Sequence, residues 1–130
     1  VGSEMCIRDR FIIDDMISSG ESMLDVAKEL KARKARRIYL AATFGLFTNG
    51  MAKFDKAYED GLFDKVLTTN LVYQTPELLS RDYYVSVDMS KYIALLIDTL
   101  NHDASISHLL NPTERINKVV NAYKKEHNQE

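Results

Sequence analysis

Cysteine is nearly absent from this sequence of 130 residues, and what is scarce narrows the classes of protein it can belong to. The single cysteine, Cys6, excludes an internal disulfide framework and any zinc site built from several cysteines. Three histidines, of which only His102 and His108 are near each other, form no metal-binding pattern. No apolar run approaches the roughly 20 residues that a membrane span requires. We therefore expect a cytoplasmic protein without a membrane partner.

The sequence also has no large excess of one charge, because its 17 Lys and Arg nearly balance its 19 Asp and Glu, for a net charge of −2. Domains that bind nucleic acid carry a basic surface, so we expect no nucleic-acid partner. The densest basic run, Lys31–Arg37, ends a predicted helix, where cations suit the helix dipole. The remaining composition, 45% apolar and 28% charged, is that of one ordinary globular domain.

The first ten residues differ from the rest of the chain. They show no hydrophobic periodicity and lack the charged and apolar regions of a signal peptide. They are similar to translated sequencing-adapter text, so we expect residues 1–10 to be a non-native leader and the natural protein to continue upstream. The domain is expected over residues 11–123, with residues 124–130 as a frayed tail.

From residue 11 onward, short apolar runs alternate with segments of helical periodicity. Strands are predicted over residues 11–13, 37–43, 63–68 and 83–87. The helix that follows Ser22 has an apolar face, which we assign to Met23, Val26, Ala27 and Leu30. Further helices are predicted around residues 52–58, from Ser90 and from Thr113. This alternation predicts an α/β fold, a doubly wound parallel sheet with helices on its faces.

An acidic pair and a serine-rich turn follow the first predicted strand. Asp14 and Asp15 are expected at its carboxyl end, where open α/β sheets bind their ligands. The turn then opens a helix that Ser22 is expected to cap. Such a turn offers free backbone N–H groups and the positive end of the helix dipole to a phosphate. The turn consists of Ser18, Ser19, Gly20, Glu21 and Ser22.

The two carboxylates would repel a phosphate, so they are expected to face another part of the ligand. Sugar hydroxyls suit carboxylates, either directly or through Mg²⁺, which prefers oxygen ligands. The pattern therefore predicts a ribose 5-phosphate site. Two alternatives stay open on the pattern alone: a simple helix-capping turn, and a receiver domain that binds Mg²⁺ at an acidic pair.

Four segments together resemble the ribose-phosphate diphosphokinases, or phosphoribosyl diphosphate (PRPP) synthetases. Phe11–Ser22 resembles the PRPP motif of type I phosphoribosyltransferase folds, and Arg37–Phe47 resembles the family's strand and Thr-His-Gly-Leu-Phe turn. Val66–Asn70 is similar to the next strand and its Thr-(Asp/Asn) turn, and Ile97–Ser107 to the C-terminal segment. The segments occur in family order over most of the chain.

The resemblance implies the C-terminal half of an enzyme of nucleotide biosynthesis that transfers diphosphate from ATP to ribose 5-phosphate, giving PRPP and AMP. It implies a homo-oligomer, Mg²⁺ as cofactor, and ribose 5-phosphate, ATP and PRPP as ligands. Asp14 and Asp15 would hold the ribose hydroxyls and Mg²⁺, and residues 18–22 the 5-phosphate. The ATP-binding parts would lie upstream, so no catalytic residue is assigned and this chain alone is expected to be inactive.

The turn departs from the Asp-Thr-Gly-Gly-Thr that is common in that family. Ser18 removes a carboxylate, and Glu21 puts a negative charge beside the phosphate unless its side chain points away. Phe44 replaces the histidine of the next turn. These departures favour one alternative function, a non-catalytic regulatory paralogue. A type I phosphoribosyltransferase is the other, against which the Phe-Gly-Leu-Phe turn and the Ser-Ile-Ser tail argue.

Overall fold

The structure, a computed structural model, describes residues 8–126 apart from the side chain of His108. Most of the predicted leader, residues 1–10, therefore lies outside the described residues, and Arg10 is already the first residue of a strand. The end of the predicted frayed tail, residues 127–130, also lies outside them. Both assignments stay predictions.

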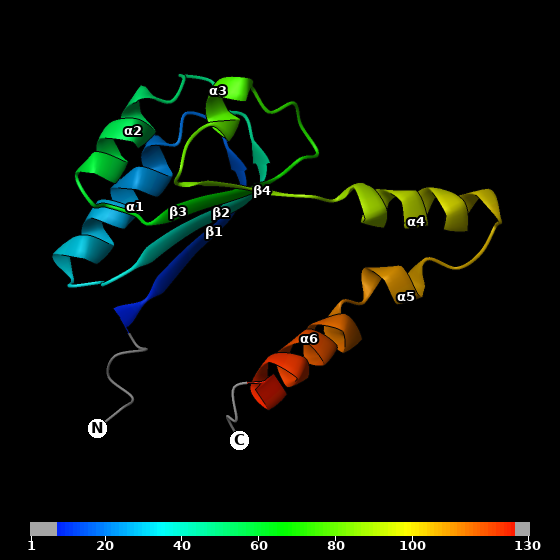
Figure 1. Cartoon of the computed structure of the whole chain (residues 1–130). Helices are drawn as coiled ribbons and strands as arrows, with labels where there is room; N and C mark the ends of the chain where they lie inside the picture. The colour runs from blue at the N-terminus through cyan, green and yellow to red at the C-terminus, as the bar shows by residue number, and fades with distance from the viewer. Residues whose placement is uncertain (1–7, 127–130) are drawn as a thin grey trace. The chain divides into compact units, whose positions relative to one another are not determined.

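The chain divides into two units, residues 1–89 and 90–130. Within its described part, from residue 8 onward, the first unit contains four strands and three helices in strict alternation (Figure 1). In chain order these are β1 (Arg10–Ile17), α1 (Glu21–Ala32), β2 (Ile38–Gly45), α2 (Ala52–Glu59), β3 (Lys65–Thr69), α3 (Pro76–Leu79) and β4 (Tyr84–Val87). The second unit is helical and contains α4 (Ser90–Asn101), α5 (Ser107–Leu110) and α6 (Thr113–Glu126).

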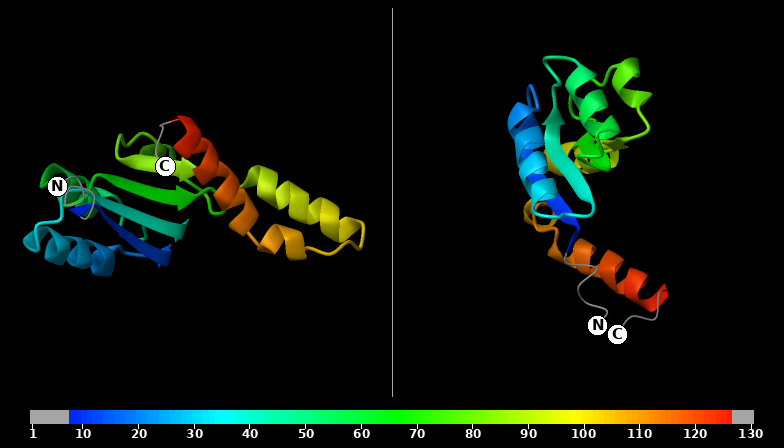
Figure 2. Two further views of the ribbon diagram at one scale, coloured as in Figure 1. Left: turned by 90° about the horizontal axis from the view of Figure 1, so that it is seen from below. Right: turned by 90° about the vertical axis from the view of Figure 1, so that its left-hand side faces the viewer.

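The four strands form one parallel sheet in the order β1-β2-β3-β4 (Figure 2). Leu40 lies opposite Ile12 on one side and Val66 on the other, and Val66 lies opposite Tyr84. The predicted α/β fold with a parallel sheet is confirmed. Because all strands run the same way, their carboxyl ends meet at one edge, where a ligand site is expected.

Helices α1, α2 and α3 lie on the same side of the sheet in Figure 1. Right-handed crossovers between strands added in sequential order lead to this arrangement. The core lies between the sheet and these helices, and includes Leu40, Val66 and the fully buried ring of Phe54. Phe11 and Ile13 of β1 point to the opposite face of the sheet, away from this core, and are 64% and 77% exposed.

The apolar face of α1 differs by one residue from the prediction. Met23, Leu24 and Ala27 are buried, whereas Val26 is 47% exposed. Leu24 and Val26 lie on either side of the stripe formed by Met23, Ala27 and Leu30, and the structure buries the side of Leu24.

A short helix, α3, begins at Pro76 between β3 and β4, where no helix was predicted. The hydroxyl of Thr75 accepts a hydrogen bond from the N–H of Leu78 at 3.1 Å. Proline suits the first position of a helix, where its missing N–H costs nothing. Pro76 therefore begins a helix here instead of excluding one.

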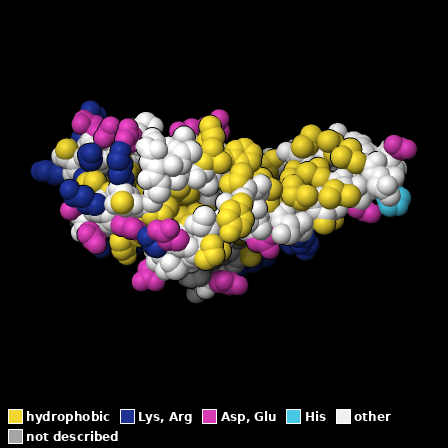
Figure 3. Space-filling model, turned by 90° about the horizontal axis from the view of Figure 1, so that it is seen from above, with side chains coloured by type: hydrophobic (Ala, Val, Ile, Leu, Met, Phe, Trp, Pro, Cys, Tyr) yellow, Lys and Arg dark blue, Asp and Glu magenta, His cyan; other side chains and the backbone are white. Residues whose placement is uncertain are grey.

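The second unit confirms the helices predicted from Ser90 and Thr113, and adds the short helix α5 between them. Tyr92 donates a hydrogen bond to the carbonyl of Leu109 at 3.0 Å, and the Arg115 guanidinium lies 5.4 Å from the centre of the Tyr92 ring. Apolar side chains gather on α4 (Figure 3), where Ile97 and Leu100 are both over 60% exposed. Among the described residues, none of the helices has the length and apolar character needed to cross a membrane.

A hydrogen-bonded ion pair joins α2 to the segment before β4. Arg81 donates to both carboxylate oxygens of Asp55, at 3.0 and 2.9 Å, and Tyr83 donates to the same carboxylate at 2.7 Å. The hydrogen bonds from Arg81 are the main cause of the lowered pKa of Asp55. Burial, followed by the Asp55 carboxylate, raises the pKa of the Tyr83 hydroxyl.

The lowered pKa of Asp55 predicts a pH-dependent contribution to stability. A carboxyl whose pKa is lower in the folded state stabilises the fold above its unfolded pKa, and the contribution is lost as the pH falls through the folded pKa. We expect Asp55→Asn to lower the free energy of unfolding at pH 7 and to have a shrinking effect as the pH falls below about 4. Urea denaturation at a series of pH values measures this.

Asp25→Asn is the matched control, because Asp25 is paired with Lys28 in an exposed i,i+3 geometry. Exposed pairs of this kind contribute little to stability. An effect of Asp55→Asn that is the same at pH 3 as at pH 7, or no larger than that of Asp25→Asn, would contradict the assignment.

Candidate functional site

The acidic pair lies within β1, because the strand does not end at Ile13 as predicted but continues to Ile17. Asp14 lies opposite Ala42 in the register of β2. Both carboxylates are exposed, and the N–H of Asp15 donates to Oδ1 of Asp14 at 2.8 Å. Successive strand residues point to opposite faces of a sheet, so the two side chains leave the strand in different directions.

A hollow of about 280 Å³ contains Asp14 near the carboxyl ends of the strands. Its lining comes from all four strands: Ile13, Asp14, Ala41, Ala42, Thr43, Leu67, Thr68, Thr69 and Val87. Asp15 is not part of this lining, so only one residue of the predicted pair, Asp14, lies at the hollow.

Two threonines, Thr43 and Thr69, lie in the same hollow and were not predicted as site residues. The hydroxyl of Thr69 donates to the carbonyl of Thr43 at 2.6 Å, which ties the end of β3 to β2. Both threonines belong to the two turns on which the family resemblance rests. The rule that parallel strands bring their carboxyl ends together could have found them.

The turn after β1 comprises Ser18, Ser19 and Gly20, and α1 begins at Glu21. The helix is capped by Gly20 in a left-handed conformation, with φ of 78°, so the prediction that Ser22 caps it was wrong. Ser22 lies in the first helical turn instead. The N–H groups of that turn have no acceptor within the helix and point out of its N-terminus, as the phosphate site requires.

The loop after β2 is joined to the end of β1 and to the turn by backbone hydrogen bonds. The N–H of Thr48 donates to the carbonyl of Ser18 at 3.0 Å, and the N–H of Leu46 donates to the carbonyl of Ile17 at 2.8 Å. The hydroxyls of Ser18 and Thr48 are 3.5 Å apart. Thr48 is therefore a further hydroxyl beside the predicted phosphate turn, which sequence reasoning missed.

The ring of Phe54 packs against the backbone of Gly20. A side chain at position 20 would collide with this ring, and Gly20 also has the left-handed conformation that other residues rarely adopt. Phe54 is fully buried and makes an edge-to-face contact with Phe47 at 5.2 Å between ring centres. The turn is thus fixed by the core of the domain.

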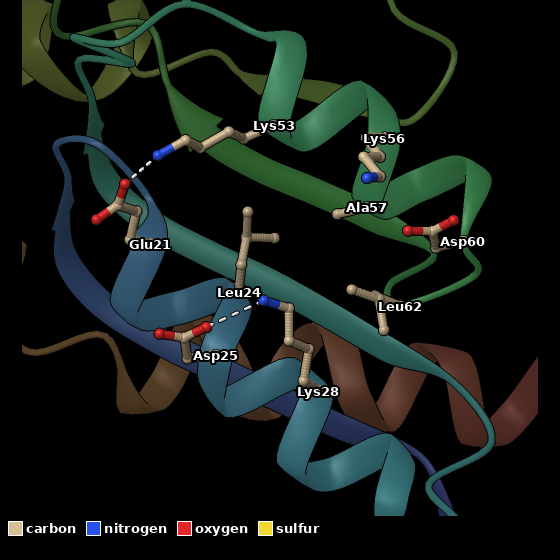
Figure 4. Close-up of a pocket in the computed structure, with 9 residues that line it drawn as sticks. All are labelled: Glu21, Leu24, Asp25, Lys28, Lys53, Lys56, Ala57, Asp60 and Leu62. Carbon is tan, nitrogen blue, oxygen red and sulfur yellow. Dashed lines mark hydrogen bonds and ion pairs between the residues drawn. The ribbon is translucent and has the colours of Figure 1, made fainter.

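The side chain of Glu21 extends from α1 towards α2, where its carboxylate forms an ion pair with Lys53 (Figure 4). The pair lies at one end of a groove of about 390 Å³ between the two helices. Other charged residues of both signs line the groove, and Figure 3 shows acidic and basic side chains intermingled over this part of the molecule. They are Asp25, Lys28, Lys56 and Asp60.

The fold places the chain in the class of phosphoribosyltransferase-like α/β domains. It is similar to the crystal structure of phosphoribosylpyrophosphate synthetase from Mycobacterium smegmatis, with a TM-score of 0.64 over 74% of this chain and 31% of that chain. The two sequences are 19% identical over this match, so the likeness concerns the fold alone.

A family profile described as "Phosphoribosyl synthetase-associated domain" matches residues 1–111. Ribose-phosphate pyrophosphokinase of Vibrio cholerae is 30% identical over 80% of this chain and 32% of its own length. The enzyme of the same name from Mycoplasma pneumoniae is 38% identical over 55% of this chain and 22% of its own. Phosphoribosyl pyrophosphate synthase-associated protein 1 of Bos taurus is 31% identical over 78% of this chain and 28% of its own.

The chain therefore belongs to the PRPP synthetase family. The resemblance found in the four sequence segments is confirmed. The chain spans about a third of the length of the curated relatives that it matches.

The packing at Gly20 predicts that two glycines with the same backbone conformation respond differently to substitution. Gly20 and Gly50 have φ values of 78° and 72°, but only Gly20 has a neighbour within 4 Å of an added Cβ. Gly50→Ala is expected to cost about 1–2 kcal/mol for the left-handed backbone alone. Gly20→Ala is expected to cost more, because Phe54 must also move. Equal losses in urea denaturation would contradict the contact.

Proposed function

We propose that this chain is the ribose 5-phosphate-binding part of a ribose-phosphate diphosphokinase. That enzyme transfers a diphosphate from ATP to ribose 5-phosphate and forms PRPP and AMP. The observation that supports the proposal most is the position of Asp14 and of the Gly20-capped turn, which follow one another at the carboxyl end of β1. Membership of the PRPP synthetase family is the reason for naming ribose 5-phosphate as the ligand of this arrangement.

In this proposal the 5-phosphate binds at the N-terminus of α1. The N–H groups of Glu21 and Ser22 and the positive end of the helix dipole attract the dianion. The hydroxyls of Ser18, Ser19 and Ser22 add donors, and Thr48 supports the turn. Of the predicted pair, Asp14 is the residue that we assign to the ribose hydroxyls, which donate hydrogen bonds to carboxylates. The side chain of Asp15 leaves β1 in the other direction.

Mg²⁺ is the cofactor that the family implies, and the acidic pair suits one way of binding it. The described residues contain no group of three side chains that could hold a metal by themselves. Mg²⁺ often uses only one or two carboxylates, together with waters and substrate oxygens. One exposed carboxylate, that of Asp14, fits that mode, in which the ion neutralises substrate charge. We propose that Asp14 would hold it, whereas the side chain of Asp15, the other residue of the predicted pair, leaves the strand in the other direction.

The chain spans about a third of the length of its relatives. We therefore propose that ATP binding and the catalytic groups are supplied by parts of the protein outside this chain. We also propose that the protein forms a homo-oligomer and is located in the cytoplasm.

A regulatory paralogue without turnover is the second candidate. The bovine synthase-associated protein is as similar to this chain, at 31% identity, as the Vibrio cholerae pyrophosphokinase at 30%. Ser18 and Glu21 also depart from the family's usual turn. The longer protein distinguishes the two candidates, since the regulatory form would bind ribose 5-phosphate and form no PRPP from it and ATP.

Calorimetric titration of ribose 5-phosphate into the 130-residue chain with Mg²⁺ tests the proposed site. We expect saturable binding that the double variant Asp14→Asn, Asp15→Asn weakens at least about tenfold, because each charge-assisted hydrogen bond contributes roughly 1.5–3 kcal/mol. The affinity for inorganic phosphate should change much less, since phosphate lacks the hydroxyls.

Asp25→Asn serves as the control, because this exposed carboxylate lies on α1 outside the turn. An equal loss of ribose 5-phosphate affinity in Asp25→Asn would point to general electrostatics. A folded chain that shows no binding in any form would contradict the proposed site.

A further inference from the structure

Glu21 presents an electrostatic conflict with the proposed phosphate. It is the first residue of α1, so its backbone N–H belongs to the set that would bind the anion. Its carboxylate carries the same sign of charge as the phosphate. If that carboxylate turned towards the N-terminus of the helix, it would oppose binding and compete for the same N–H groups.

A lysine of α2 pairs with this carboxylate and holds it away from the N-terminus of α1. Lys53 lies 32 residues further along the chain and forms an ion pair with the Glu21 carboxylate (Figure 4). The nearby charges of the same groove do not substitute for it. Asp25 is already paired with Lys28 at 3.2 Å. Lys56 lies further along α2, and Asp60 is the residue that follows the end of this helix.

The contact between Phe54 and Gly20 holds the two partners in place. Phe54 follows Lys53 in the sequence, and Gly20 precedes Glu21. Because the Phe54 ring packs directly on the Gly20 backbone, it fixes the distance between the two neighbouring backbones that bear the ion pair. The pair itself is half-exposed, so its orienting effect depends on this rigid support rather than on burial.

We infer that Lys53 is a positioning residue for the phosphate turn: it holds the Glu21 carboxylate against α2 and so leaves the N-terminus of α1 open to a phosphate monoester. The inference rests on the proposed function. It assigns to Lys53 an action through Glu21, without contact with the ligand.

A carboxylate released beside a bound dianion should weaken binding by about threefold to tenfold, given solvent screening at a few ångströms. Lys53→Met should therefore raise the dissociation constant of ribose 5-phosphate by that factor. Lys53→Arg should restore the wild-type value, since arginine can still pair with Glu21. Lys56→Met is the matched control, because Lys56 lines the same groove on the same helix.

A double-mutant cycle with Glu21→Gln decides whether Lys53 acts through Glu21. Calorimetry with Mg²⁺ is the measurement, and urea denaturation checks that each variant is folded. We expect Lys53→Met to have no effect on affinity in the Glu21→Gln background, where no carboxylate remains to be held. An equal loss in both backgrounds would make Lys53 a direct ligand and overturn the inference while leaving the proposed site intact.

Three other results would overturn the inference. One is an unchanged affinity in Lys53→Met, and another is an equal loss in Lys56→Met. The third is binding by Glu21→Gln but not by the wild type, which would show that Glu21 closes the site despite Lys53. Failure of every folded form to bind, Glu21→Gln included, would instead contradict the proposed function and the inference with it.

Discussion

The packing of the Phe54 ring on the backbone of Gly20 is the contact on which the site depends. It requires glycine twice, once for the left-handed φ of 78° and once for the space that the ring occupies. It fixes where α1 begins, and therefore where the N–H groups of its first turn point. Since Phe54 is also central to the core, the geometry of the turn is coupled to the stability of the domain.

Much of the architecture could be predicted because it depends on local periodicity. Four strands, the principal helices and the order of acidic pair, turn and helix all follow from the spacing of apolar residues. The boundaries were less accurate. The acidic pair was expected beyond the strand, but an exposed position in a parallel strand tolerates aspartate, so β1 continues to Ile17. Ser22 was expected to cap α1, but the close approach of Phe54 selects Gly20 as the cap.

The residues that sequence reasoning missed act through long-range contacts. Lys53 meets Glu21 across 32 positions, and Thr48 meets Ser18 across 30. No periodicity signals such pairs, because they depend on how two helices and two loops pack on the sheet. The sequence indicated that Glu21 would place a negative charge beside the phosphate, whereas its partner Lys53 could be identified only from the fold. A departure from a family motif is thus best judged together with its tertiary surroundings.

The central claim is that the turn between β1 and α1 binds a phosphate monoester. The most direct measurement is a titration of the isotope-labelled chain with ribose 5-phosphate and Mg²⁺, followed by two-dimensional amide NMR. The account predicts saturable shifts centred on the N–H groups of Gly20, Glu21 and Ser22. Shifts centred on the basic run Lys31–Arg37, with the turn unaffected, would contradict it.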